Sequence, residues 1–181
     1  YLIENIGLPP SNILAVTFTN KAAQEMKSRV VDLVGVDISG INIGTFHSIS
    51  AQILRKEINQ LGYNNNFTIY DQADSRSIVK MVINELNLDV KQYNPKTYQI
   101  KISNAKNSLQ SPEDINKIAA NINEERFSQI YARYNDVLKV NNSVDFDDLL
   151  ILPVKLFNKY PNRLEYYQKK FQYVLVDEYQ D

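Results

Sequence analysis

The sequence of 181 residues contains no cysteine and no tryptophan, and it has only five glycines, two methionines and one histidine. Without cysteine the chain has no disulfides, no thiolate metal ligands and no cysteine nucleophile, which fits a reducing compartment. No apolar run approaches the ~20 residues that cross a bilayer. The opening residues 1–7 lack the basic region of a signal peptide. We therefore expect a cytoplasmic protein.

An excess of charge of one sign is also absent. The 20 lysines and arginines balance 21 aspartates and glutamates, for a net charge of -1. No overall positive field would therefore draw the chain onto DNA without specificity. Hydrophobic residues make up 44% of the chain and charged residues 23%, which is ordinary for a globular protein with a real core.

Neither end of the sequence has the pattern expected at the end of a natural domain. There is no initiator methionine, and residues 1–3 have the pattern of a helix already under way. The chain stops at Asp181, shortly after the apolar run 173–176. A parallel strand needs a crossover of about a dozen or more residues to reach its neighbour. We expect the sequence to be a segment of a larger protein.

Two strand–turn–helix units open the chain. Residues 13–16 form a continuous apolar run, which is typical of a strand covered on both faces in a parallel sheet. A helix with one apolar side follows and is expected to stop at Gly35. The pattern then repeats, with a strand at 41–44 and a helix that runs to Gly62. Successive units of this kind predict an α/β fold with parallel strands.

The pattern becomes helical from residue 63 to residue 142. Asp71 and Ser111 stand where helix N-caps are expected, and the stretch has no buried-strand pattern. Pro153 falls inside a later apparent helix, where an interior proline costs ~3 kcal/mol, so we expect a kink or a break there. We expect an α/β domain made of residues 1–62 and 143–181, interrupted by a mostly helical insertion of residues 63–142.

The strongest chemical motif lies at the C-terminal end of the sequence. An apolar strand brings two adjacent carboxylates, Asp177 and Glu178, to its carboxyl end, where open α/β sheets bind ligands. In nucleotide hydrolases, the first carboxylate of such a pair holds Mg²⁺ and the second polarises the attacking water. The alternative is a solvated turn after a strand. The apolar run followed by Asp-Glu-x-Gln-Asp favours the functional interpretation.

The phosphate-binding loop that should accompany this pair is missing from the sequence. Nucleotide hydrolases of this class hold phosphates with a glycine-rich loop followed by lysine and serine or threonine. The five glycines are scattered, and none of them precedes Lys-Ser or Lys-Thr. The carboxylate pair that would hold Mg²⁺ is present, but the phosphate-binding loop is not. This agrees with the expectation that the sequence is cut upstream of Tyr1.

Two turns carry a threonine–phenylalanine pair at the end of a predicted strand, in residues 17–20 and 45–48. Hydroxyl and amide side chains beside a helix N-terminus suit a phosphate, and an aromatic ring such as Phe18 can stack on a base. Taken alone, each turn is better explained by helix capping and core packing. His47, the only histidine, has no Ser/Asp partner pattern for nucleophilic catalysis. At one sheet edge, the two turns together predict a groove for a sugar–phosphate chain.

A row of lysines in the helical stretch forms a further candidate for phosphate contacts. The lysines recur at five-residue spacing, so they spiral round a helix and do not form one stripe. A solvated surface is an equally good explanation. The row consists of Lys91, Lys96, Lys101 and Lys106.

The order and spacing of these motifs resemble the UvrD/PcrA/Rep helicases of superfamily 1A along essentially the whole chain. The matching segments are residues 13–26 for motif Ia, 45–48 for motif Ib, 144–150 for the segment that re-enters domain 1A, and 176–181 for motif II, the Walker B box. The helical stretch corresponds to subdomain 1B and looks closer to the PcrA branch than to the AddA/RecB-type helicase–nucleases, which share these motif types.

The resemblance implies part of a RecA-like P-loop NTPase domain, 1A, that carries the helical subdomain 1B. It implies an ATP-driven 3′→5′ DNA translocase and helicase in repair or plasmid replication. Asp177 would coordinate Mg²⁺, Glu178 would activate water for attack on the γ-phosphate, and Gln180 and Asp181 would couple the ATP site to DNA. Expected partners are single-stranded DNA, junctions of single- and double-stranded DNA, and repair or replication-initiator proteins. The implied DNA contacts are Phe18, Thr19, Asn20, Thr45 and His47, with Lys101 and Lys106 as candidate backbone contacts.

The departures from the family pattern limit what this segment can do alone. The Q-motif, motif I and motifs III to VI are absent from the sequence, so the resemblance implies that the segment by itself is inactive. The alternative from another class is a non-catalytic module that binds DNA or a protein through the helical insertion, with Asp177 and Glu178 structural. A Gly-Lys-Thr loop encoded shortly upstream of Tyr1 would separate the two hypotheses.

Overall fold

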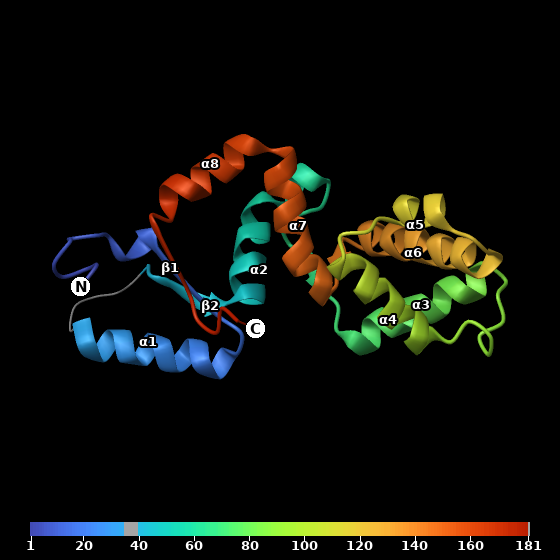
Figure 1. Ribbon diagram of the computed structural model, residues 1–181, viewed down its shortest axis with the longest axis horizontal. Coiled ribbons are helices and arrows are strands. Elements are labelled where there is room, and N and C mark those ends of the chain that lie inside the picture. Colours follow the sequence, from blue (N-terminus) through green and yellow to red (C-terminus); the bar gives the residue numbers. More distant parts are fainter. Residues whose placement is uncertain (35–39, 181) are drawn as a thin grey trace. The chain divides into compact units, whose positions relative to one another are not determined.

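The computed structural model describes residues 1–34 and 40–180, which form two compact units (Figure 1). The first unit comprises residues 1–56 and 153–181, and the second comprises residues 57–152. The fold is mixed α/β with parallel strands, as the sequence predicts, so the predicted fold class is confirmed. The predicted domain bounds stay a prediction, because compact packing alone does not identify an insertion.

A three-stranded parallel sheet in the order β2-β1-β5 forms the centre of the first unit. The expected strand at residues 13–16 is the central strand, and its Ile13, Ala15 and Val16 are buried. By contrast, the four side chains of β5 are all exposed. The strands are β1 (Ile13–Thr17), β2 (Asn42–Thr45) and β5 (Tyr173–Val176).

The helices of the first unit differ in how much they bury. The first long helix, α1, buries none of its residues, whereas Ile49 and Leu54 of α2 are buried. Residues 2–6 form turns where the sequence suggested a helix under way, and Gly35, the expected stop of α1, lies outside the described residues. The elements are η1 (Pro10–Asn12), α1 (Asn20–Val34), α2 (Phe46–Glu57) and α8 (Pro161–Lys170).

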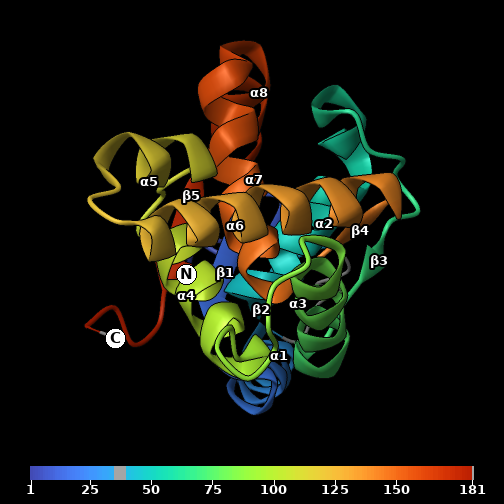
Figure 2. The ribbon, with the colours of Figure 1, turned by 90° about the vertical axis from the view of Figure 1, so that its right-hand side faces the viewer.

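The second unit is mostly helical and has its own apolar core, to which Val79, Ile102, Ile130 and Leu138 belong. Helix α3 packs against α4 and α6, and α5 packs against α6 (Figure 2). A two-stranded parallel sheet of β3 and β4 completes the unit, and the sequence analysis did not predict it. The elements are η2 (Ile58–Leu61), β3 (Thr68–Ile69), α3 (Gln72–Glu85), α4 (Pro95–Asn107), α5 (Pro112–Ile118), α6 (Ile122–Val140) and β4 (Ser143–Val144).

The predicted helix N-caps are confirmed. Asp71 accepts hydrogen bonds from the backbone amides at the start of α3 and forms a capping box with Asp74. Ser111 and Asp114 form the same reciprocal arrangement at the start of α5. The left-handed backbone of Gly62, with φ of 81°, ends η2 as expected.

The sequence predicts a kink or a break at Pro153, and the break is wrong, because helix α7 (Phe146–Lys159) continues through this proline. Proline lacks the amide hydrogen that would bond to the carbonyl of Leu149, at a cost of ~3 kcal/mol in a helix interior. Burial of Leu149, Leu152 and Leu156 along the same helix offsets this cost. Within residues 1–34 and 40–180, no helix has the length and apolar character needed to span a membrane.

Candidate functional site

The carboxyl ends of the three parallel strands of the first unit meet at one edge of the sheet. Val16 lies opposite Val176, and Thr17 lies opposite Thr45. The amide of Asp177 donates to the carbonyl of Val16 at 2.9 Å, and the hydroxyl of Thr17 donates to Oδ2 of Asp177 at 3.4 Å. The register therefore brings both threonine–phenylalanine turns and the carboxylate pair to the same edge.

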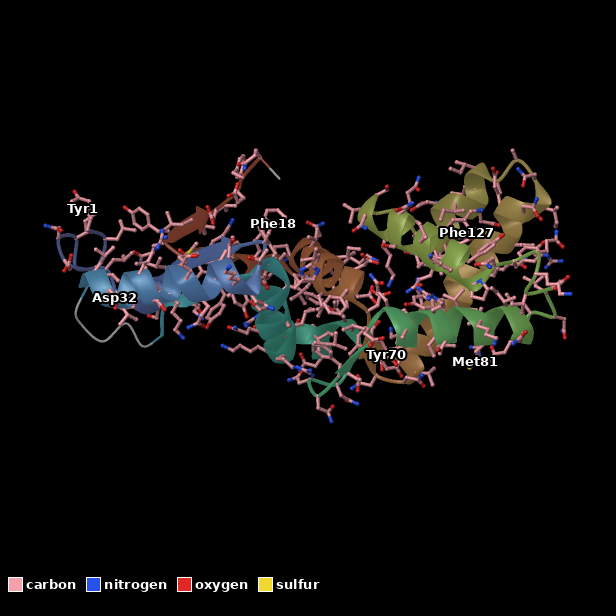
Figure 3. The ribbon with its side chains drawn as sticks, turned by 90° about the horizontal axis from the view of Figure 1, so that it is seen from below. Tyr1, Phe18, Asp32, Tyr70, Met81 and Phe127 are labelled. Atoms are coloured by element: carbon pink, nitrogen blue, oxygen red, sulfur yellow. The ribbon has the colours of Figure 1, made fainter. Side chains whose placement is uncertain are left out.

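Two phenylalanines from neighbouring strand ends form a ring pair at this edge. The ring centroids of Phe18 and Phe46 lie 5.4 Å apart, with 59° between the ring planes. The Phe18 side chain is 50% exposed, so it is not a core residue (Figure 3). The sequence places Phe46 in one of the two turns, but only Phe18 was predicted as a DNA contact. The pair offers an apolar surface on which a base could stack.

One threonine in each turn, Thr19 and Thr45, caps the helix that follows it. Thr19 Oγ1 accepts from the amide of Ala22 at 3.1 Å, and Thr45 Oγ1 accepts from the amide of Ser48 at 3.1 Å. The capping interpretation of these turns is therefore confirmed. A threonine hydroxyl that accepts such a bond still has its own hydrogen to donate. Thr19 is exposed and can offer that hydrogen to a ligand, whereas Thr45 is only 7% exposed.

The remaining predicted DNA-contact residues of the first unit lie at the starts of the two helices. Asn20 is exposed at the first position of α1. His47 is half-buried in the first turn of α2, where it already interacts within the protein. Asn20 is therefore the more accessible of the two.

Glu178 has an unusual backbone conformation. Its φ of 55° lies in the left-handed region, which costs a residue with a Cβ atom roughly 1–2 kcal/mol. Such strain concentrates at functional sites. The Gln180 side-chain amide donates to Oε2 of Glu178. Asp181, the last residue of the predicted motif, lies outside the described residues.

The donor set at this edge suits part of a magnesium site. Asp177 is exposed and supplies carboxylate oxygens, and the Thr17 hydroxyl lies beside it. Mg²⁺ takes oxygen ligands and usually relies on one or two carboxylates, with phosphates and waters for the rest. Among the described residues, no cluster of three or more His, Cys, Asp or Glu side chains could hold a metal alone. The residues present therefore fit a magnesium–nucleotide complex better than a bare metal ion.

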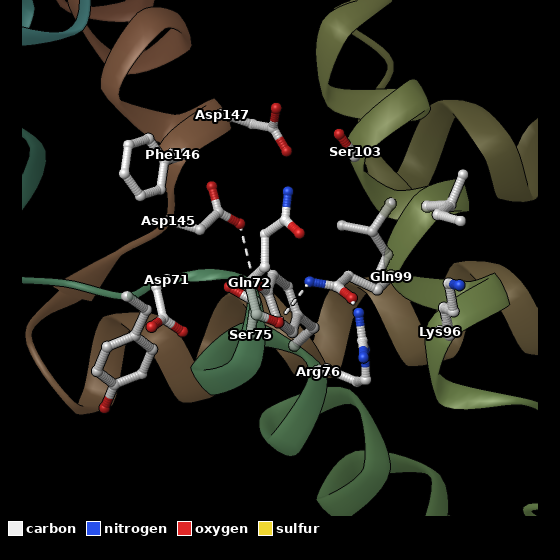
Figure 4. A pocket seen from close by; sticks show the side chains of 14 residues that line it. Asp71, Gln72, Ser75, Arg76, Lys96, Gln99, Ser103, Asp145, Phe146 and Asp147 are labelled. Atoms are coloured by element: carbon white, nitrogen blue, oxygen red, sulfur yellow. Dashed lines mark hydrogen bonds between the residues drawn. The ribbon is translucent and has the colours of Figure 1, made fainter.

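A cavity of about 360 Å³ lies in the second unit, between α3, α4 and the start of α7 (Figure 4). Arg76 Nε donates to the side-chain oxygen of Gln99 at 3.1 Å, and the Gln99 amide donates to the carbonyl of Gln72 at 2.8 Å. Lys96 adds a second positive charge to the lining of the cavity. Phe146 also lines the cavity and is 50% exposed. This cavity was not predicted from the sequence, although Phe146 lies within the matching segment 144–150.

The two lysines proposed as DNA backbone contacts have different surroundings. Lys101 is exposed, with its Nζ 4.9 Å from the ring centroid of Tyr98. The side chain of Lys106 is 3% exposed, and its Nζ lies 2.7 Å from both Asp145 Oδ2 and Asp148 Oδ1. This position corrects the expectation for Lys106, because a buried ammonium that is held by two carboxylates cannot reach a phosphate. Lys101 remains a candidate.

The buried charges change the titration of their neighbours. Burial alone would lower the pKa of Lys106, but the charges of Asp148 and Asp145 outweigh it and hold that pKa above its ordinary value. Burial raises the pKa of Asp148. At Asp145 burial is the largest single influence and acts in the same direction, but the charge of Lys106 and the hydrogen bonds from Lys106, the Asp148 amide and the Tyr134 hydroxyl together outweigh it and lower the pKa. Burial, together with the charge of Asp148, raises the pKa of Tyr63 to about 12. Burial likewise raises the pKa of Tyr134.

Comparison with known proteins gives one consistent family. The family model "UvrD/REP helicase N-terminal domain" matches residues 1–181. An ATP-dependent DNA helicase PcrA from Bacillus subtilis (strain 168) is 48% identical over 100% of this chain and 24% of its own length. PcrA helicases from Staphylococcus epidermidis (strain RP62A) and Staphylococcus aureus (strain Mu50) are 45% and 44% identical, over 100% of this chain and 25% of theirs. The chain therefore spans about a quarter of the length of these relatives.

Proposed function

Because this chain belongs to the UvrD/REP helicase family, we propose that it is the part of an ATP-dependent 3′→5′ DNA helicase that carries Walker B chemistry and DNA contacts. The observation that carries the proposal is the meeting of Thr17, Phe18, Phe46 and Asp177 at one sheet edge. The whole protein would unwind duplex DNA in the cytoplasm, in repair or plasmid replication. Its partners would be single-stranded DNA, junctions of single- and double-stranded DNA, and repair or replication-initiator proteins.

On the nucleotide side, Asp177 would hold the Mg²⁺ of a bound magnesium–nucleotide complex. The Thr17 hydroxyl donates to Oδ2 of this carboxylate and so orients it. Bound Mg²⁺ would neutralise charge on the phosphate oxygens. Glu178, the next residue, would accept the proton of the attacking water. Its exposed carboxylate and its constrained backbone support this role.

The residues that follow the carboxylate pair would couple the ATP site to the bound DNA. The Gln180 side chain donates to Glu178, so a change at the nucleotide can reach Gln180 directly. We assign Gln180 and Asp181 to this coupling. The isolated chain would not hydrolyse ATP, since none of its glycines precedes Lys-Ser or Lys-Thr to form a phosphate cradle.

On the DNA side, we propose a surface built from both threonine–phenylalanine turns. Phe18 and Phe46 would stack on bases, and the exposed Thr19 and Asn20 would donate hydrogen bonds to phosphates. Thr45 would act mainly by capping α2, the helix whose first turn carries His47. In the second unit, Lys101 would contact a phosphate and the exposed Phe146 would contact a base.

Paired substitutions in the full-length helicase test this assignment. Glu178→Gln keeps size and hydrogen bonding but removes the basic carboxylate, so DNA-stimulated ATPase should fall by ~10²–10⁴-fold. Binding of ATP and DNA should survive, because Asp177 and the DNA-contact residues are intact. Asp177→Asn should in addition weaken magnesium-dependent nucleotide binding. Near wild-type ATPase in Glu178→Gln would contradict the assignment and favour a non-catalytic binding module.

A further inference from the structure

The last residue of the central strand, Thr17, carries a buried hydroxyl at the carboxyl edge of the sheet. Thr17 is 1% exposed and ends a strand whose other residues, 13–16, are all apolar. Valine has nearly the same shape and would fill this position without needing a hydrogen bond. A buried hydroxyl is costly unless it is hydrogen-bonded, so packing alone does not explain a threonine here.

The hydrogen bond that this hydroxyl makes is a long one. Thr17 Oγ1 donates to Oδ2 of Asp177 at 3.4 Å, whereas O–H···O hydrogen bonds in proteins are usually about 2.7–2.8 Å long. The backbone of Asp177 is held more closely, because its amide donates to the carbonyl of Val16 at 2.9 Å. The hydroxyl and the carboxylate therefore lie side by side on two paired strand ends, with room for the bond between them to shorten.

The next residue, Phe18, contacts the other flanking strand end. Its ring centroid lies 5.4 Å from that of Phe46, which directly follows β2. Two successive residues at the end of β1 thus reach both neighbours in the sheet, Thr17 on the side of β5 and Phe18 on the side of β2. Because the peptide unit that joins them is planar and rigid, a displacement of Phe18 also moves Thr17.

We propose that Thr17 is a positioning residue that transmits DNA binding at Phe18 to the carboxylate of Asp177. A base that stacks on Phe18 shifts the end of β1 and shortens the hydrogen bond from Thr17 to Oδ2. The carboxylate is then held in one orientation, and Oδ1 remains available for Mg²⁺. This regulation rests on the proposed function and adds a second route to the one assigned to Gln180 and Asp181.

Thr17→Val in the full-length helicase removes the hydroxyl and keeps the shape of the side chain. The first readout is the ratio of ATP hydrolysis rates with and without an oligothymidine, because a change common to both rates cancels in it. This ratio should fall about tenfold, which is a typical size for a coupling between two sites. Thr17→Ser keeps the hydroxyl and should retain most of the ratio, whereas the equally small Thr17→Ala should lose it.

A binding measurement tests the same coupling without hydrolysis. If two sites are coupled, each ligand changes the affinity of the other by the same factor. Anisotropy of a fluorescein-labelled oligothymidine gives this factor as the ratio of DNA dissociation constants with and without Mg²⁺ and a non-hydrolysable ATP analogue. In Thr17→Val the factor should approach one. DNA affinity without nucleotide should stay close to that of the parent, because Thr17 is too buried to touch DNA.

Ser128→Ala is the matched control. Ser128 of α6 is 6% exposed, and its hydroxyl donates to the carbonyl of Pro112 at 2.9 Å. This variant also loses a buried hydroxyl and its hydrogen bond, but it leaves the sheet edge intact, so the rate ratio and the coupling factor should both stay those of the parent. An equal loss in the control would overturn the proposal, since reduced stability would then explain both variants.

A folded Thr17→Val variant that keeps both the rate ratio and the coupling factor would overturn the proposal and leave Thr17 as a packing residue. A parent factor of one would overturn it as well. In either case the proposed function stands as long as Glu178→Gln abolishes hydrolysis. If Glu178→Gln instead hydrolyses ATP like the parent, the proposed catalytic role fails, and the coupling factor still decides the role of Thr17.

Discussion

Replacing Phe18 by alanine separates the two roles that the structure gives this ring. Half of the side chain is buried, and its ring packs 5.4 Å from that of Phe46. Burial of half a phenylalanine side chain is worth about 1 kcal/mol, and a tilted ring pair adds about 0.5–1.5 kcal/mol. The free energy of unfolding of the 181-residue chain should therefore fall by roughly 1.5–2.5 kcal/mol, which urea unfolding measures.

The same substitution should weaken DNA binding through the exposed half of the ring. One base–aromatic stack is worth ~1–3 kcal/mol, which corresponds to roughly 5- to 150-fold in the dissociation constant. The dependence of affinity on salt should stay the same, because no phosphate contact is lost. The assay is fluorescence anisotropy of a labelled oligothymidine with the full-length helicase at several salt concentrations.

Phe157→Ala is the matched control. Phe157 is also half-buried in the first unit, and its ring centroid lies 5.5 Å from that of Tyr167 with 54° between the ring planes. It should lose similar stability and keep its DNA affinity, since it lies outside the proposed contact surface. If Phe18→Ala loses stability as the control does while its DNA affinity is untouched, Phe18 is a packing residue and does not stack on a base.

Three further predictions follow from the geometry of single residues. Gly44→Ala should cost ~1–3 kcal/mol of unfolding free energy, because the new Cβ would lie 2.5 Å from Ser48 Oγ. Adding Ser48→Ala should recover most of that loss in a double-mutant cycle by urea unfolding, and strictly additive losses would show that the contact is not the cause. Between pH 10 and 12 the chain should lose stability, since Tyr63 keeps its proton to a pKa of about 12 when folded but loses it near 10 when unfolded. The stability that Tyr63 contributes below pH 10 is thus lost as the pH rises. Tyr63→Phe should make this decline shallower by up to about 2 kcal/mol. An identical decline in the variant would contradict the raised pKa of Tyr63. Finally, calorimetry should detect no saturable micromolar binding of ATP to the isolated chain, because Asp177 supplies a metal with only one or two ligands, and clear binding would contradict the inferred lack of a phosphate cradle.

The elements that the sequence predicted well are those set by local patterns. The strand at residues 13–16 is marked by an uninterrupted apolar run, and the helix starts at Asp71 and Ser111 are marked by residues that bond to nearby amides. The strands β3 and β4 are only two residues long each, which is too short for a periodic pattern. Their pairing depends on the packing of the second unit and leaves no local signal.

The misjudged residues depend on partners far along the chain. Lys106 read as a surface lysine because its spacing is judged on one helix, but its partner Asp145 is 39 residues away in the sequence. The importance of Phe46 depends on the strand register that places it beside Phe18. The left-handed backbone of Glu178 has no sequence signal either, because glutamate does not favour that conformation. These features follow from tertiary packing and could be found only in the structure.

The exposed strand β5 also has a consequence for the isolated chain in solution. Among the described residues it pairs only with β1, so its other edge offers unpaired backbone groups beside four exposed side chains. An apolar edge of this kind can recruit the same strand of another molecule and start aggregation. Charged residues that flank an apolar strand act as gatekeepers against this process. Lys170 precedes β5, and Asp177 and Glu178 follow it. Neutralising Asp177 and Glu178 would therefore promote self-association through β5, as well as removing the proposed metal binding and proton transfer.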